Sequence, residues 1–179
     1  MKTLVLYATR EGQTRKIATR IVETLKGLGV ECDLFSFDEI GEPDWSLSDR
    51  VLLGSSIRYG VYQKVFRRFV ERHLDRLAAV PNGFFAVNLV ARKEGKNTPE
   101  TNVYTRHYLE KTSWKPDLCS VFAGALLYPR YNFLERLMLR LLMSYTGGPT
   151  DPTKEYVFTD WEKVKAFAKE AAALTAKRS

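Results

Sequence analysis

The chain has 179 residues, with 28 lysines and arginines against 21 aspartates and glutamates, a formal net charge of +7, and 45% hydrophobic residues. This composition predicts one folded domain and excludes a largely disordered chain, while two cysteines cannot build a disulfide framework or a four-thiolate zinc site. Because there is no run of about 18 apolar residues and no signal-peptide pattern, we expect a cytosolic-side protein whose basic surface favours an anionic ligand, an anionic membrane or nucleic acid.

Apolar runs typical of buried strands alternate with amphipathic helical patterns along the chain. The predicted strands cover residues 3–8, 30–36, 51–54, 84–89 and 118–124, and the predicted helices cover residues 14–28, 62–77, 98 towards 114, 131–143 and 159 onward. Capping patterns mark two helix starts: Thr98 is followed by Pro99, and Thr159 is followed by Glu162. This alternation predicts a single α/β domain over residues 1–179, with a doubly wound, five-stranded parallel sheet and helices on both faces.

Doubly wound sheets bind ligands beyond the carboxyl ends of their strands, so the loop after the first strand is the first candidate site. Its residues are Thr9, Arg10, Glu11, Gly12, Gln13 and Thr14. Two threonine hydroxyls and the free amides at the helix start can surround a phosphate, although an ordinary turn with a threonine cap explains the composition equally well. The absence of a Walker lysine and of a GxGxxG motif disfavours a nucleoside triphosphate or a dinucleotide.

The residues around this loop occupy every specified position of the FMN-phosphate signature of the flavodoxin family. They are Val5, Leu6, Tyr7, Thr9, Gly12, Thr14, Ala18 and Ile21. The chain therefore resembles the flavodoxins. The resemblance implies a flavodoxin-like fold with strand order 2-1-3-4-5 and FMN as the cofactor, its phosphate held by hydroxyl groups and amides.

In a flavodoxin-like fold, the loops after the third and fourth strands border the isoalloxazine ring. The candidate cofactor-binding residues in these loops are Ser55, Ser56, Ile57, Arg58, Tyr59, Gly60, Asn88, Leu89, Val90, Ala91 and Arg92. Tyr59 is the candidate for stacking on the flavin; the alternative is a half-buried aromatic residue that holds the next helix in place. Flavodoxins often carry an aromatic residue where this chain has Leu89 and Val90, which leaves the second face of the flavin open to substrate.

Cations, but no recognisable general base, accompany these loops. Arg58, Arg92 and Lys93 either attract an acidic substrate and stabilise a reduced, anionic flavin or form a solvated basic rim. His73 and His107 both fall on predicted helices, where a surface or core position is the simpler interpretation. We therefore assign no catalytic residue and no metal site from the sequence.

A long insertion, residues 125–156, precedes the last helix. Within it, the helix predicted for residues 131–143 is apolar except for one arc that holds Asn132, Glu135, Arg136 and Arg140. Such a helix suits the interface of a bilayer, with its arginines towards the headgroups. The alternative is a helix that packs on the sheet or in the interface of an oligomer.

Several stretches together resemble a narrower family, the menaquinone-dependent protoporphyrinogen IX dehydrogenases of γ-proteobacteria. These stretches are Gly54–Gly60, Val87–Lys93, Ala123–Leu126, Tyr128–Tyr131 and Thr159–Trp161, and the likeness runs from Met1 to about Leu174. The resemblance implies a peripheral flavoprotein of haem biosynthesis at the cytoplasmic face of the inner membrane. Such an enzyme oxidises protoporphyrinogen IX to protoporphyrin IX and passes electrons to menaquinone or ubiquinone. Candidate residues for contact with substrate or membrane are Lys93, Arg130, Arg136 and Arg140.

Two other functions fit the predicted fold. A soluble electron-transfer flavodoxin would only dock redox partners, and the insertion and the basic loops argue against it. An NAD(P)H:quinone reductase would need a nicotinamide site, for which the sequence shows no dedicated motif. Nucleic-acid binding is disfavoured because the basic residues are scattered and follow no known reading module.

Overall fold

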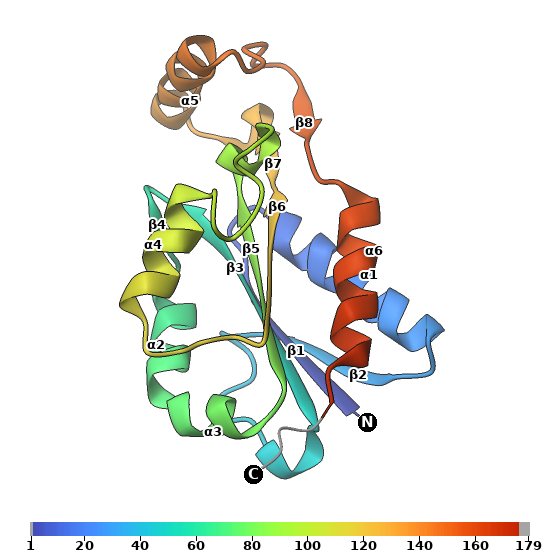
Figure 1. Cartoon of the computed structure of the whole chain (residues 1–179). Helices are drawn as coiled ribbons and strands as arrows, with labels where there is room; N and C mark the ends of the chain where they lie inside the picture. Colours follow the sequence, from blue (N-terminus) through green and yellow to red (C-terminus); the bar gives the residue numbers. More distant parts are fainter. Residues whose placement is uncertain (1, 176–179) are drawn as a thin grey trace.

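Five parallel strands form a central sheet with the order β2-β1-β3-β5-β6 (Figure 1). The computed structural model describes residues 2–175. The strands are β1 (Lys2–Ala8), β2 (Glu31–Ser36), β3 (Arg50–Arg58), β5 (Asn82–Asn88) and β6 (Leu118–Ala123). Counted along the chain without the short β4, this is the predicted order 2-1-3-4-5. The register places Val5 beside Leu34 on one side and Leu52 on the other, which buries the middle of β1 within the sheet.

Helices cover both faces of this sheet, as predicted (Figure 1). On one face lie α1 (Gln13–Gly27) and α6 (Trp161–Ala173), and on the other lie α2 (Lys64–Arg72), α3 (Leu74–Ala79) and α4 (Val103–Lys111). Each layer buries its own apolar cluster. Phe167 packs edge-on against Phe122 on the first face, and Phe66 stacks on Phe84 on the second. This framework brings the carboxyl ends of all five strands to one edge.

Two predicted helices are wrong in their extent. Residues 62–77 are not one helix, because Tyr62 belongs to β4 (Val61–Tyr62), which pairs antiparallel with β3, and His73 separates α2 from α3. The helix predicted from Thr98 begins only after Asn102, whose side-chain oxygen accepts a hydrogen bond from the Thr105 amide (3.3 Å). The Thr98 hydroxyl instead bonds that of Thr101 (2.9 Å) and closes a turn before the helix.

The cap of α6 also differs from the prediction. Asp160, not Thr159, caps the helix, because its carboxylate accepts hydrogen bonds from the amides of Glu162 and Lys163, both at 3.0 Å. The Thr159 hydroxyl is buried, donates to the Ala123 carbonyl (2.7 Å) and accepts from the Gln13 side chain (2.9 Å). Thr159 therefore ties α1 and α6 to the end of β6 instead of starting the helix.

Replacing Asp160 by alanine should lower the free energy of unfolding by about 1 kcal/mol, because two amides at the start of α6 lose their acceptor. Urea unfolding followed by circular dichroism measures this change. Asp160→Asn is the matched control, since asparagine caps helices as well as aspartate does. Equal losses in the two variants would show that the charge of Asp160, not its capping geometry, stabilises the helix.

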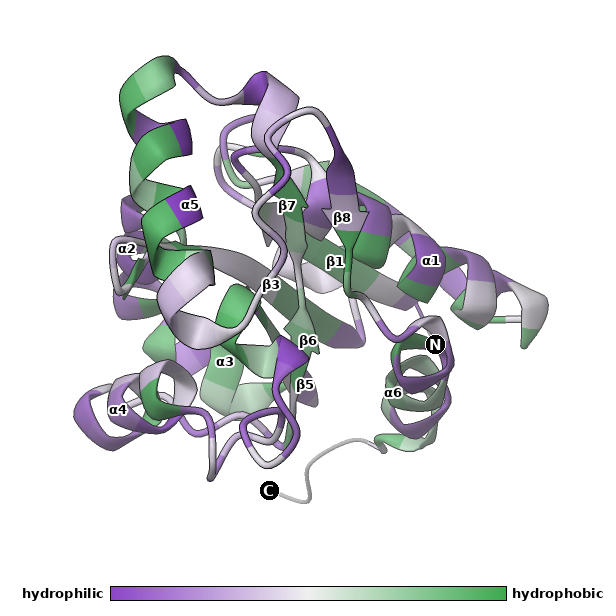
Figure 2. Cartoon of the chain, turned by 90° about the horizontal axis from the view of Figure 1, so that it is seen from above, coloured by the Kyte–Doolittle hydropathy of each residue, from purple (hydrophilic) through white to green (hydrophobic). Residues whose placement is uncertain are grey.

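The predicted insertion folds as a small layer above the carboxyl edge of the sheet. It comprises β7 (Ala125–Leu127), α5 (Phe133–Thr146) and β8 (Glu155–Val157), and β7 and β8 pair antiparallel. Tyr128, Tyr131 and Met143 are buried among these elements. Figure 2 shows α5 at one side of this layer as a largely hydrophobic helix. No helix within residues 2–175 combines the length and the apolar composition that crossing a bilayer requires.

Candidate functional site

The loop between β1 and α1 makes a tight turn at Gly12. Gly12 has a left-handed backbone (φ 90°), which favours glycine, and its amide donates to the Thr9 hydroxyl (3.0 Å). Helix α1 then starts at Gln13, so the amides of its first turn have no partner within the helix. The positive end of the helix dipole adds to this preference for an anion.

Thr14 provides the most specific sign of a ligand in this loop. Its side chain is 1% exposed, and its hydroxyl has no hydrogen-bond partner within residues 2–175, although the residue lines a cavity. A buried hydroxyl without a partner costs free energy that a bound acceptor recovers. Phosphate oxygens are such acceptors, so the residues present fit the phosphate of a flavin mononucleotide.

The second wall of the site is the hairpin between β3 and β4. The segment Ser55–Arg58, expected as a loop, is the end of strand β3, because Arg58 pairs with Val61 across a two-residue turn. Tyr59 and Gly60 both have left-handed backbones (φ 49° and 82°), the pattern of a tight hairpin turn, and such a backbone is uncommon for tyrosine. Ser56, Ile57, Tyr59 and Gly60 line the cavity, and the Arg58 side chain is outside the described part of the chain.

The third wall follows β5 and is held by buried amides. Asn88 accepts a hydrogen bond from the Ala91 amide (3.0 Å) and exchanges hydrogen bonds with the side chain of Asn102 (3.1 and 3.2 Å). These bonds fix the 3-10 helix Leu89–Arg92, so that Leu89 and Val90 line the cavity. The site therefore has an apolar, non-aromatic surface at this loop.

Arg92 does not line the cavity. Its guanidinium donates to the Leu89 carbonyl (3.0 Å) and to the Thr146 hydroxyl (2.8 Å) at the end of α5, and burial lowers its pKa. These contacts favour a structural role, in which Arg92 holds α5 against the loop after β5, over the expected role in binding an acidic substrate.

Helix α5 forms the fourth wall, and none of its cavity-lining residues is among the predicted site residues. The α5 residues on this wall are Glu135, Met138, Leu139 and Leu142, and Tyr131 precedes them. The first four follow the i, i+3, i+4, i+7 spacing of one helical face, so the signal was present in the sequence. An ion pair between Arg10 and Glu135 (3.0 Å) joins this wall to the loop after β1, and the Tyr59 hydroxyl donates to the same carboxylate oxygen (3.3 Å).

Together these walls enclose about 280 Å³ at the carboxyl edge of the sheet. Val87, Tyr104, Gly124 and Ala125 complete the lining. The sequence-predicted residues that line it are Thr9, Arg10, Glu11, Gln13, Thr14, Ser56, Ile57, Tyr59, Gly60, Asn88, Leu89 and Val90. Those with described side chains that do not line it are Gly12, Ser55, Ala91, Arg92, Lys93, Arg130, Arg136 and Arg140. Three of the predicted loops therefore meet at one cavity, and most of the predicted cations lie outside it.

Most of the remaining candidate cations already bind other groups of the protein. Arg130 pairs with Glu155 (2.7 Å), Arg136 donates to the Tyr131 carbonyl (3.0 Å), and Arg140 donates to the Thr150 carbonyl (3.0 Å). These bonds stabilise the insertion. Of the described residues that line the cavity, only Arg10 carries a positive charge.

Two carboxylates, Glu11 and Glu135, also line the cavity. Burial raises the pKa of Glu11, and the nearby charge of Glu135 raises it further, against a smaller opposing effect of Arg130.

The two histidines do not line the cavity: His73 is buried between Trp45 and Phe69, and His107 is exposed on α4.

Comparison with known proteins agrees with this geometry. Residues 4–153 match the family model described as a flavodoxin domain. The chain belongs to the flavodoxin-domain family. A flavodoxin from the domain Archaea has the same fold, with a TM-score of 0.53 and 18% identity over 96% of each chain.

Much more similar relatives match nearly all of this chain. A protein of Escherichia coli K12 named protoporphyrinogen IX dehydrogenase (quinone) is 51% identical over 177 residues, which cover 99% of this chain and 98% of the relative. A protein of Leishmania major with the same name is 47% identical over 174 residues, which cover 97% of this chain and 75% of the relative. Within the flavodoxin-domain proteins, the chain therefore belongs to the family of these two relatives. This is the narrower family that the sequence motifs resemble.

Proposed function

We propose that this protein is an FMN-dependent protoporphyrinogen IX dehydrogenase that passes electrons to menaquinone or ubiquinone, in haem biosynthesis. The observation that carries the proposal is the cavity, which combines an anion-binding helix start with apolar walls at the switch point of a flavodoxin fold. The identity of 51% over nearly the whole length of a relative so named supports the reaction and both substrates.

The residues present divide the cavity into a polar and an apolar part. The hydroxyls of Thr9 and Thr14, with the amides of the first turn of α1, would hold the phosphate of FMN. Tyr59, Leu89 and Val90 would border its ring. When bound, FMN would supply the chemistry of accepting electrons two at a time and giving each pair to a quinone, and the conversion of one porphyrinogen to porphyrin requires three such rounds. The walls exclude water and orient the ring, and Glu11 is a carboxylate beside the cavity that can take up a proton.

The test is to mix the FMN-loaded protein with protoporphyrinogen IX without oxygen and to follow flavin absorbance and porphyrin fluorescence. We expect the flavin to bleach on mixing. After a menaquinone analogue is added, we expect the flavin colour to return and porphyrin fluorescence to appear, because one porphyrin requires the removal of three electron pairs and each FMN holds one. An electron-transfer flavodoxin would give no porphyrin fluorescence. An NAD(P)H:quinone reductase would bleach with nicotinamide and not with porphyrinogen. Either outcome would contradict the proposal.

We also propose that the protein binds the cytoplasmic face of the inner membrane through α5. We call Phe133, Leu134, Leu137, Leu141 and Tyr145 the outer face of α5; all five side chains are exposed, and Tyr145 is 92% exposed. Apolar side chains that share one helical face suit the boundary between headgroups and acyl chains. Arg136 and Arg140 each bond a carbonyl group of the insertion, and we assign the main contact with lipid to the five apolar and aromatic side chains of the outer face.

Replacing Leu134 and Leu141 together by asparagine should weaken binding to vesicles of phosphatidylethanolamine and phosphatidylglycerol by at least about 10-fold, because burial of one leucine contributes about 1.5–3 kcal/mol. Co-sedimentation measures the bound fraction. Leu28 and Leu47 are exposed leucines in other elements, and their double asparagine variant is the control, which should bind normally. If both variants bind equally well, α5 is not the membrane contact.

A further inference from the structure

We propose that Met138 and Leu142 form an apolar opening through which the isoprenoid tail of the quinone reaches the cavity from the membrane. This inference rests on the proposed function and adds to it the residues that bind the acceptor. Both side chains line the cavity, yet both are largely accessible to solvent, Met138 at 46% and Leu142 at 49%. They are therefore at the mouth of the cavity and not in its interior.

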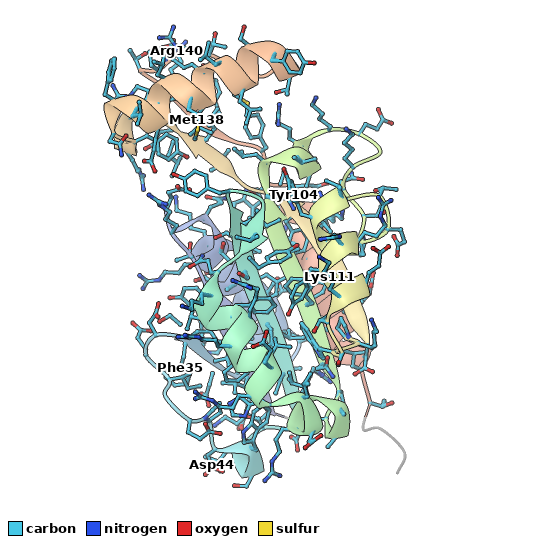
Figure 3. All side chains as sticks on the ribbon, turned by 90° about the vertical axis from the view of Figure 1, so that its left-hand side faces the viewer. Phe35, Asp44, Tyr104, Lys111, Met138 and Arg140 are labelled. Atoms are coloured by element: carbon cyan, nitrogen blue, oxygen red, sulfur yellow. The ribbon has the colours of Figure 1, made fainter. Side chains whose placement is uncertain are left out.

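The opening is continuous with the outer face of α5. Leu134 precedes Met138 by four residues and Leu141 follows it by three, so their side chains are neighbours on the helix surface. In Figure 3, Met138 lies on the side of α5 that faces the rest of the protein, and Arg140 lies on the opposite side. An apolar molecule can thus move from the outer face to the cavity without passing a charged side chain of α5.

The wall across the cavity from α5 is also largely apolar. Tyr104 of α4 lines the cavity together with Leu89 and Val90, and Figure 3 shows Tyr104 below α5, on the side of the helix where Met138 lies. Methionine suits such a position, because its flexible thioether adapts to apolar groups of different shapes. The opening therefore has apolar groups on both sides.

Charge decides which of the two substrates uses this opening. Protoporphyrinogen carries propionates, which need cations, whereas an isoprenoid tail carries no charge. The one cation among the described lining residues, Arg10, is bonded to Glu135, which is three residues before Met138 and seven residues, or about 10 Å along the helix, before Leu142. Its charge is therefore already paired at the Met138 side of the opening. Arg92 lies near the Leu142 end, since it bonds Thr146, but its guanidinium is held by the protein and does not line the cavity. Among the described lining residues, Met138 and Leu142 therefore offer a propionate no cation of their own and suit the tail.

The experiment compares two double variants on the same helix, Met138→Asn with Leu142→Asn and Leu134→Asn with Leu141→Asn. Each removes two exposed apolar side chains, but only the first pair lines the cavity. The acceptors are 2-methyl-1,4-naphthoquinone and the same ring with an isoprenoid tail. KM for each is measured with protoporphyrinogen IX as the reductant, at a concentration of phosphatidylethanolamine and phosphatidylglycerol vesicles at which co-sedimentation shows the natural protein and both variants fully bound. Flavin content and the urea midpoint verify that both variants are folded.

For the Met138 and Leu142 pair, we expect KM for the tailed quinone to rise by about 10-fold relative to KM for the tailless ring, as loss of about two methylene contacts implies. For the Leu134 and Leu141 pair, we expect this ratio to stay within about 2-fold of the natural value. An equal change of the ratio in both pairs, or no change in either, overturns the opening alone. A natural protein that oxidises porphyrinogen with neither quinone overturns the proposed function and the opening together.

Discussion

The Thr14→Val variant should bind FMN roughly 10- to 100-fold more weakly than the natural protein, because a hydrogen bond to a charged group contributes about 1.5–3 kcal/mol. The Thr14 hydroxyl is buried, lines the cavity and has no partner among the described residues, so a bound phosphate is the acceptor that we expect for it. Valine has nearly the same shape, and α1 should therefore keep its position. Quenching of flavin fluorescence on titration with the apoprotein gives the dissociation constant.

Thr24→Val is the matched control on the same helix. The Thr24 hydroxyl donates to the Arg20 carbonyl (2.8 Å), is exposed, and does not line the cavity. FMN affinity should be unchanged in this variant. If Thr14→Val and Thr24→Val bind FMN equally well, the phosphate is not bound at the start of α1.

The Gly54→Ala variant should lose about 3 kcal/mol of its free energy of unfolding, the upper end of the usual cost of overpacking a core. A Cβ atom at Gly54 would lie 2.0 Å from the Phe85 ring, on the neighbouring central strand. Phe85 is fully buried and packs edge-on against Phe167 at 6.0 Å between ring centroids, so its ring cannot move aside without disturbing the layer of α6. Urea unfolding measures the loss.

Two further variants test this explanation. Gly27→Ala, near the end of α1, meets no atom within 4 Å and should be neutral or stabilising, since alanine favours helices. Adding Phe85→Leu to Gly54→Ala should recover part of the lost stability, which a double-mutant cycle measures as a coupling between the two residues. Additive losses would show that strand distortion and not the ring contact causes the effect.

The strand order and the division into layers could be predicted because periodicity records which side chains are buried. Buried runs such as Leu4–Ala8 have no polar alternation, which is typical of parallel strands covered on both faces. Helix boundaries were less predictable. Thr98 and Asn102 both have side chains that can cap a helix, and only tertiary contacts decide between them, since Asn102 also bonds the buried Asn88.

Three loops of the site could be predicted from local patterns and the strand order. The spacing of the fourth wall marks one face of α5, but it does not show what that face contacts. Nothing local indicates that α5 packs above the loop after β1, because the contact between Arg10 and Glu135 spans 125 residues. The hydrogen-bond partners of Arg92 and Arg140 also come from tertiary contacts, so the sequence alone predicts both side chains to be available for a substrate or a lipid. An arginine that lies close to site residues along the sequence can thus have its hydrogen bonds taken by other parts of the folded protein.

The ion pair between Arg10 and Glu135 links the loop after β1 to α5. Displacing α5 would break this pair and release Arg10 from the position that it holds beside the anion site. Thermodynamic linkage is reciprocal. If a ligand at the loop raises the affinity of α5 for a partner by some factor, that partner raises the affinity of the loop for the ligand by the same factor. Under the proposed function, adsorption of α5 at a lipid surface and retention of the nucleotide are coupled equilibria.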